Sequence, residues 1–380
     1  MRIVDVSEFY SGRSGVYTYV ERKFAAAARH GHHLTVIAPG GEDRTERRDG
    51  GEVMWVRAPY LPLDRNYRMF WSAEPVWRAI DAAAPDLVEG SSPWRGGWLA
   101  GYWPGKAARA FVFHQDFVAG YPHTFLGGMM TRPAIDRLFM PYWRYLRRLS
   151  ARFDATVTGG AWLARRLDAF GVHRPHAVPF GVSPGVFSPA RRNENLRCQL
   201  LARCGIAGDG KLLLAVGRLH PEKRHRTILK AFALAREKQP MGLVILGDGL
   251  RRKAVEARAS RIGHVHMAGA VTDRDLLADI YASADVLVHG SAAETYGFAV
   301  GEAMLSGLPV VVPDHGGAPD LASHGPSRIY KTGDAVSCSA AVLDLLAAKG
   351  PFAPAVGIGS LDEHFAGLFA LYETLVGRRL

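Results

Sequence analysis

The stretch from Val286 to Val312, VLVHGSAAETYGFAVGEAMLSGLPVVV, constrains the fold of this 380-residue chain more than any other. Its apolar runs VLV and PVVV have the composition of buried strands. The segment between them predicts a helix from about Phe298 to Ser306 that stops at Gly307. Strand, helix and strand in this order form half of a parallel α/β unit, so we expect an α/β fold.

Two acidic residues, Glu294 and Glu302, flank the start of this predicted helix. A helix N-terminus attracts anions because its first amides lack a partner within the helix. The amides of Thr295 to Phe298 therefore suit a phosphate, and each carboxylate can accept from sugar hydroxyls. The alternative is that Glu294 is an ordinary first-turn acid and Glu302 a solvated helix residue.

The segment ETYGFAVGEAMLSGLPVVV resembles the E-x7-E signature of family 4, the retaining, nucleotide-sugar-dependent glycosyltransferases of the GT-B fold. The resemblance implies two Rossmann-like, doubly wound α/β domains that face a central cleft. It implies that Glu294 contacts the donor sugar and Glu302 the nucleotide ribose. It also implies metal-independent hexosyl transfer without a cofactor.

A second motif follows the apolar strand LLLAVG, where Arg218 stands at the end of the strand and Lys223 just before the next helix. A rigid guanidinium and a point-like ammonium that converge there could neutralise a diphosphate, although both could be ordinary loop cations. The run V-G-R-L-x-x-x-K matches the diphosphate-binding pair of family 4. In that family, backbone groups near the position of Val271 recognise the nucleobase.

The first half of the chain contributes further candidates. Gly12 and Gly15 lie in a loop between the strand RIVDVS and a helix, where a phosphate could approach the backbone or where the chain simply turns. The strand FVF ends in His114, which could be structural, but FHQDF resembles a family 4 segment whose histidine lies beside the donor sugar. Asp116 and Arg13 are our candidates for acceptor binding.

These candidates form one predicted site, in which Glu294, His114, Arg218 and Lys223 carry the reaction. The predicted donor-binding residues are Gly12, Gly15, Arg218, Lys223, Val271, Glu294, Thr295, Tyr296, Gly297, Phe298 and Glu302.

Composition narrows the function classes. Hydrophobic residues at 48% and charged residues at 22% are typical of a globular enzyme, and no apolar run is long enough to cross a bilayer. The three cysteines are an odd count without metal-ligand spacing and fit a reducing compartment, so we expect a cytoplasmic protein. The net charge of +11 predicts an anionic partner. The basic helix near residues 141–153, with an apolar stripe on its other face, is either solvated or in contact with the inner face of an anionic membrane.

We expect an N-terminal acceptor-binding domain at 1–189, completed by a last helix at 361–380, and a nucleotide-sugar-binding domain at 190–360. The segment SSPWRGGW, residues 91–98, is expected to be a loop. The expected partners are a UDP- or GDP-linked sugar and a glycan, lipid-linked or small-molecule acceptor, without nucleic acid. An epimerase or phosphorylase of the same fold, and a non-catalytic protein that binds membrane or nucleic acid, remain alternatives.

Overall fold

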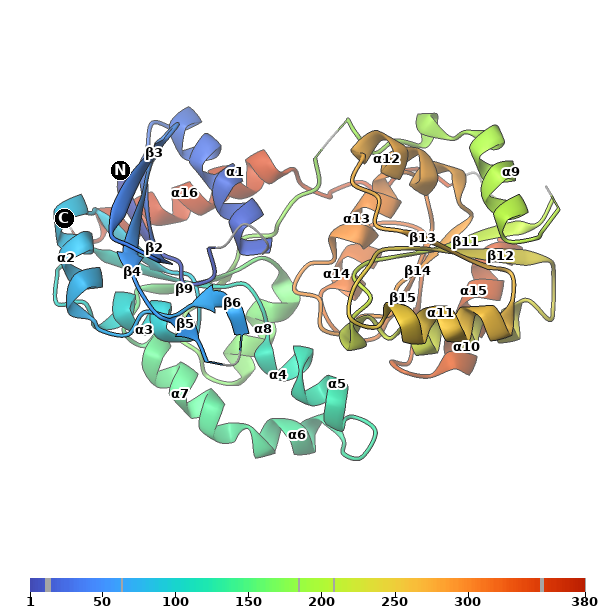
Figure 1. The fold of residues 1–380 in the computed structure, drawn as a ribbon, viewed down its shortest axis with the longest axis horizontal. Helices are drawn as coiled ribbons and strands as arrows, with labels where there is room; N and C mark the ends of the chain where they lie inside the picture. Colours follow the sequence, from blue (N-terminus) through green and yellow to red (C-terminus); the bar gives the residue numbers. More distant parts are fainter. Residues whose placement is uncertain (11–14, 63, 184, 208, 349–351, 380) are drawn as a thin grey trace. The chain divides into compact units, whose positions relative to one another are not determined.

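The computed structural model describes residues 1–10, 15–62, 64–183, 185–207, 209–348 and 352–379. The chain forms two compact units (Figure 1). Unit 1 contains Met1–Asp116, Pro133–Pro179 and Asp362–Leu380, and unit 2 contains Phe117–Arg132 and Phe180–Leu361. Each unit has its own sheet, which is parallel throughout in unit 2 and parallel except for one strand in unit 1. This confirms the expected α/β class with two Rossmann-like units.

Unit 1 is built on a sheet whose described strands follow the order β10-β9-β8-β7-β1-β2-β4-β3. Neighbouring strands are parallel except β3, which is antiparallel to β4. The strands are β1 (Arg2–Val6), β2 (His33–Gly40), β3 (Arg44–Arg48), β4 (Gly51–Arg57), β7 (Leu87–Gly90), β8 (Ala108–Phe113), β9 (Ala155–Thr158) and β10 (Pro175–Ala177), with a separate hairpin of β5 (Tyr60–Leu61) and β6 (Asp64–Arg68).

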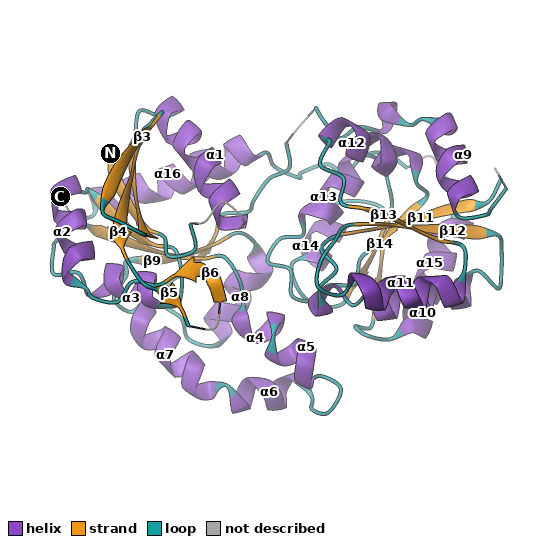
Figure 2. Cartoon of the chain, in the orientation of Figure 1, coloured by secondary structure: helices purple, strands orange, loops and turns teal. Residues whose placement is uncertain are grey.

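Helices cover both faces of this sheet (Figure 2). The central strands are therefore apolar on both sides, as in β1, where Ile3, Val4 and Val6 are fully buried. The helices of unit 1 are α1 (Gly15–Arg29), α2 (Glu74–Ala83), α3 (Arg95–Tyr102), α6 (Arg132–Leu138), α7 (Met140–Ser150), α8 (Ala161–Ala169) and α16 (Leu361–Gly377).

Helix α3 corrects one prediction, because the segment expected to be a loop is helical from Arg95 onward. Glycines are poor helix formers, which is why the sequence favoured a loop. The helix forms because Glu8, at the carboxyl end of β1, accepts a hydrogen bond at Oε2 from the backbone amide of Gly96 at 2.9 Å. Glycine also allows close packing, since a Cβ on Gly97 would lie 2.0 Å from the Ser92 carbonyl oxygen.

A buried charged cluster joins α1 and α16 to the sheet. Lys23 of α1 donates to Glu89 of β7 and lies 3.4 Å from Asp5 of β1, and all three side chains are fully buried. Tyr372 of α16 donates to Glu89 Oε2 at 2.6 Å. Burial and the neighbouring Glu89 raise the pKa of Asp5 to about 7. The cluster thus connects elements from both ends of the chain.

Unit 2 contains a fully parallel sheet whose described strands follow the order β13-β12-β11-β14-β15-β16. The strands are β11 (Lys211–Val216), β12 (Met241–Leu246), β13 (Val265–Gly269), β14 (Val286–Val288), β15 (Val310–Pro313) and β16 (Ser327–Tyr330). The helices are α4 (Phe117–Gly120), α5 (Pro122–Leu126), α9 (Glu194–Arg203), α10 (His225–Ala235), α11 (Arg252–Ile262), α12 (Arg274–Ser283), α13 (Phe298–Leu305), α14 (Ala318–Ala322) and α15 (Ala335–Ala347), with 3₁₀ turns η1 (Pro189–Arg191) and η2 (Pro221–Lys223).

The strand order of unit 2 reverses between β11 and β14, which are neighbours in the sheet. Such a reversal opens a crevice beyond the carboxyl ends of the two strands, where doubly wound sheets bind ligands. The predicted helix of the opening stretch is present here as α13. Among the described helices we find no candidate for a bilayer-spanning segment.

Candidate active site

The loops that follow β11 and β14 meet at the reversal point of the unit 2 sheet. The β11 loop carries Lys223 and the β14 loop carries Glu294. Gly290 allows the loops to touch, because a Cβ there would lie 2.3 Å from the Lys223 carbonyl oxygen. The loop that follows β15 supports the β14 loop, since the Gly317 amide donates to the Glu294 carbonyl oxygen at 2.7 Å.

Lys223 and Glu294 form an ion pair in which Lys223 Nζ donates to Glu294 Oε1. The two side chains are only 18% and 19% exposed. His289 Nε2 lies 3.4 Å from the same carboxylate oxygen. Burial alone would raise the pKa of Glu294, but Lys223 and His289 outweigh it and hold this pKa well below its usual range. Glu294 is therefore ionised and acts only as an acceptor at neutral pH.

The N-terminus of α13 follows Glu294 directly. Gly297 precedes the helix with a φ of +103°, a left-handed conformation that glycine adopts without strain. The backbone amides of Thr295, Tyr296, Gly297 and Phe298 have no acceptor among the residues that the structure describes. Free amides at the positive end of a helix attract an anion, so they suit the phosphate predicted for this position.

Glu302 lies in the second turn of α13 and has its own partners. Tyr281 donates to Glu302 Oε2 at 3.2 Å, and an Arg274 nitrogen lies 3.5 Å from Oε1. The Glu302 side chain is 12% exposed, so it is not the solvated residue of the alternative interpretation. The Arg274 guanidinium lies over the Phe187 ring, with 5.1 Å between its carbon and the ring centre.

Two further predicted donor residues lie on loops at the same edge of unit 2. The Arg218 side chain is 78% exposed, and a terminal nitrogen of its guanidinium lies 3.4 Å from Glu222 Oε1. Arg218 is thus paired with Glu222, whereas Lys223 contacts Glu294. Val271 is half-buried in the loop between β13 and α12.

Three predicted residues lie in unit 1. His114 follows β8, and burial lowers its pKa to about 4, so the imidazole is neutral at pH 7. Asp116 is fully buried, where Arg166 donates to it and also to Asp136. Gly15 is the exposed first residue of α1. Gly12 and Arg13 lie outside the described residues.

Three residues that contact the two predicted carboxylates were not predicted from the sequence: His289, Arg274 and Tyr281. His289 had a usable signal, because it directly follows β14 at the ligand-binding edge of the sheet. Arg274 and Tyr281 lie on α12, 28 and 21 residues before Glu302 in the chain. Their contacts with Glu302 depend on how the helices pack, so the sequence alone does not reveal them.

Known protein families match both halves of the chain. The family "Glycosyltransferase Family 4" matches residues 13–185, and "Glycosyl transferases group 1" matches residues 210–348. A GDP-mannose-dependent alpha-mannosyltransferase of Mycobacterium tuberculosis is 33% identical over 332 residues, which cover 84% of this chain and 81% of that protein.

A second relative is the GDP-mannose-dependent alpha-(1-6)-phosphatidylinositol dimannoside mannosyltransferase of Mycobacterium tuberculosis. It is 30% identical over 319 residues, which cover 82% of this chain and 79% of the relative. Among solved structures, sucrose-phosphate synthase from Thermosynechococcus elongatus matches with a TM-score of 0.70 at 17% identity, and the match covers 100% of this chain and 97% of the other. At this identity, the structural match supports the fold.

Proposed function

Since this chain belongs to glycosyltransferase family 4, a family of retaining enzymes with the GT-B fold, we propose that it transfers mannose from GDP-mannose to a glycolipid. The class of reaction follows from the relatives: the chain is a hexosyltransferase that uses a nucleotide-diphosphate sugar. Both relatives are named for GDP-mannose and one for a phosphatidylinositol dimannoside, which supports the donor and the acceptor proposed here. They do not favour the epimerase, phosphorylase or non-catalytic alternatives.

The observation that carries the proposal is the ion pair between Lys223 and Glu294 beside the free amides of α13. When the bond between the anomeric carbon and the diphosphate oxygen breaks, negative charge builds up on the departing diphosphate. Lys223 has three N–H donors, of which one meets Glu294, so two are available for phosphate oxygens. The amides of Thr295 to Phe298 add fixed dipoles at the same place, and such preorganised donors stabilise developing charge.

Each of the remaining predicted residues also has a proposed role. Glu294 accepts a hydrogen bond from a hydroxyl of the donor sugar, and Glu302 accepts one from the ribose. Arg218 turns from Glu222 toward the diphosphate. His114 binds a sugar hydroxyl as a neutral imidazole, because its lowered pKa leaves it uncharged at pH 7. Asp116 and Arg13 stay predictions for acceptor binding, and Gly12 stays a prediction for phosphate binding. Gly12 and Arg13 lie outside the described residues.

We propose that transfer needs no divalent cation, because Lys223 and Arg218 supply positive charge for the diphosphate. Turnover in the presence of EDTA tests this. Unchanged turnover is expected, and a loss that added Mg²⁺ or Mn²⁺ restores would contradict it.

A donor comparison tests the proposed function. With a mannosylated phosphoinositide as acceptor, kcat/KM is measured for GDP-mannose, GDP-glucose, UDP-glucose and UDP-N-acetylglucosamine. We expect GDP-mannose to exceed the others by at least about tenfold and to give a longer, α-linked glycolipid. Faster turnover with a UDP-linked sugar would overturn the proposed donor, and transfer only to a water-soluble sugar would overturn the proposed acceptor.

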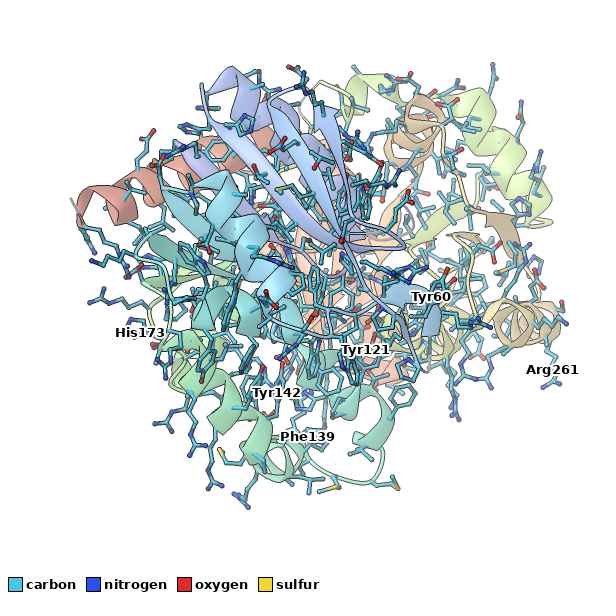
Figure 3. The ribbon with its side chains drawn as sticks, turned by 60° about the vertical axis from the view of Figure 1, so that its left-hand side comes forward. Tyr60, Tyr121, Phe139, Tyr142, His173 and Arg261 are labelled. Atoms are coloured by element: carbon cyan, nitrogen blue, oxygen red, sulfur yellow. The ribbon has the colours of Figure 1, made fainter. Side chains whose placement is uncertain are left out.

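A glycolipid acceptor requires access to a membrane surface, and α7 offers positive charge for it. Arg144, Arg147 and Arg148 of α7 are exposed, while its apolar residues Trp143, Leu146 and Leu149 are buried. The apolar stripe expected for an interfacial helix therefore packs into unit 1. Tyr142 and Phe139, at the start of the helix, are half-buried (Figure 3). We propose that α7 contacts anionic lipid by charge rather than by insertion.

Vesicle sedimentation tests this contact. Wild type should bind vesicles that contain phosphatidylinositol more strongly than phosphatidylcholine vesicles, and added salt should weaken binding. Arg144→Glu with Arg148→Glu should reduce binding. Lys253→Glu with Arg261→Glu is the charge-matched control, since both residues are exposed on α11. Figure 3 labels Arg261. Equal losses in the two double variants would contradict a role specific to α7.

A further inference from the structure

His289 is the first residue after β14 and lies at the ligand-binding edge of unit 2. Its backbone is held on both sides, because its amide donates to the Val311 carbonyl oxygen at 2.8 Å and its carbonyl oxygen accepts from Tyr330 at 3.0 Å. The His289 side chain is 3% exposed. The imidazole therefore sits on a rigid element.

The imidazole faces the carboxylate of Glu294. His289 Nε2 lies 3.4 Å from Glu294 Oε1 and is a buried nitrogen without a hydrogen bond among the described residues. A buried nitrogen that makes no close hydrogen bond is costly, and the Glu294 carboxylate is the group with which His289 Nε2 can pair. A modest tightening of this contact would give a charge-assisted hydrogen bond.

Both polar neighbours of Glu294 approach the same oxygen. Lys223 Nζ and His289 Nε2 lie at Oε1, and no hydrogen bond or ion pair among the described residues involves Oε2. A carboxylate accepts hydrogen bonds at both oxygens. With Oε1 held by these two groups, Oε2 is available for a hydroxyl group of a ligand.

We propose that His289 is a positioning residue that holds Oε1 of Glu294 so that Oε2 meets the donor sugar. The inference rests on the sugar-binding role of Glu294 in the proposed function. It also explains why Glu294 has two neighbours: Lys223 is shared with the diphosphate, so the imidazole is the contact that stays with the carboxylate when the donor binds.

Calorimetric titration of the full-length enzyme with GDP and with GDP-mannose tests this role. The ratio of the two dissociation constants measures what the sugar adds to binding. His289→Leu removes the donor atom and keeps a similar volume, and it should shift this ratio against GDP-mannose by about tenfold while the affinity for GDP stays unchanged. His289→Gln places an amide N–H near the position of Nε2 and should restore the wild-type ratio.

Two comparisons distinguish a failure of the proposed role of Glu294 from a failure of the proposed role of His289. Glu294→Gln should shift the ratio at least as far as His289→Leu does. An unchanged ratio in Glu294→Gln would overturn the proposed role of Glu294, whereas a shift in Glu294→Gln with none in His289→Leu would overturn only the role of His289. If His289→Leu also loses GDP binding, the pair His289→Gln and His289→Asn decides. The shorter Asn cannot reach Glu294, so equal ratios in these two variants would overturn the proposal.

Discussion

The ion pair of Lys223 and Glu294 sets the charge of the proposed donor site at the residue scale. The Lys223 stem passes Gly217, where a Cβ would lie 3.6 Å from Lys223 Cδ, so a methionine stem can follow a similar path. Lys223→Met should therefore fold but lose about 10²- to 10³-fold in kcat, the usual effect of removing one donor to a developing anion. Steady-state kinetics with GDP-mannose measures this loss.

The control for this variant is Lys230→Met, because Lys230 is an exposed lysine of α10. It should leave kcat within about twofold of wild type, as surface substitutions usually do. Equal kcat values in the two variants would contradict the role of Lys223.

The same pair predicts a dependence of stability on pH. In the folded protein, Lys223 and His289 hold the pKa of Glu294 below the ordinary value of 4.5. The unfolded chain therefore binds this proton more tightly than the folded chain. The stabilisation is fully present above the ordinary pKa and is lost as pH falls from there through the lowered folded pKa.

Lys223→Met should accordingly lower the free energy of unfolding by about 1–3 kcal/mol at pH 7 and by less at pH 3. Urea unfolding of wild type and variant from pH 3 to pH 7 measures the difference. A difference that does not change with pH would mean that the ion pair is not its source.

At the scale of elements, the start of α13 is fixed by the turn that follows β15. A Cβ on Gly317 would lie 2.5 Å from the Thr295 carbonyl oxygen, so Gly317→Ala must displace the segment that carries Glu294. We expect kcat/KM for GDP-mannose to fall at least about tenfold, with about 1–3 kcal/mol of lost stability.

Gly377→Ala is the matched substitution, because Gly377 ends α16 and a Cβ there would meet nothing within 4 Å beyond its own helix among the described residues. Kinetics and thermal unfolding of both variants provide the comparison. Loss of stability in Gly317→Ala with unchanged kinetics would show that the turn supports the fold without positioning Glu294.

The elements also show what the sequence could reveal. The opening stretch predicted a helix from Phe298 to Ser306, and α13 spans Phe298–Leu305, because apolar strands and Gly307 mark its limits locally. Helix α3 was wrongly expected to be a loop. Its N-terminus depends on Glu8, which lies 88 residues from Gly96 in the chain. A local sequence pattern cannot reveal a hydrogen-bond partner that lies so far away in the chain.

The same distinction holds for the candidate site. Lys223 and Glu294 are 71 residues apart, yet both follow strands of a parallel sheet. Residues that follow parallel strands lie at the same edge of the sheet, so the motifs were enough to predict that the two would lie close together. The contacts of Asp116 with Arg166 depend on how helices pack in unit 1, and the sequence could not supply them.

At the scale of the whole molecule, the last helix completes the first unit. Tyr372 and Glu89 are 283 residues apart and form a buried hydrogen bond to a carboxylate. Tyr372→Phe removes that hydrogen bond with almost no change in shape, and it should cost about 1.5–3 kcal/mol because a buried charged acceptor loses a donor. Urea unfolding of the full chain measures this loss.

Tyr102→Phe is the control, because Tyr102 belongs to the same unit and is 37% exposed. It should leave the urea midpoint unchanged. The affinity for GDP should stay at the wild-type value in Tyr372→Phe, since the proposed phosphate-binding groups Lys223 and the amides of α13 belong to unit 2. A wild-type midpoint in Tyr372→Phe would contradict the stabilising role of α16, and weakened GDP binding would show that the two units do not act independently in holding the nucleotide.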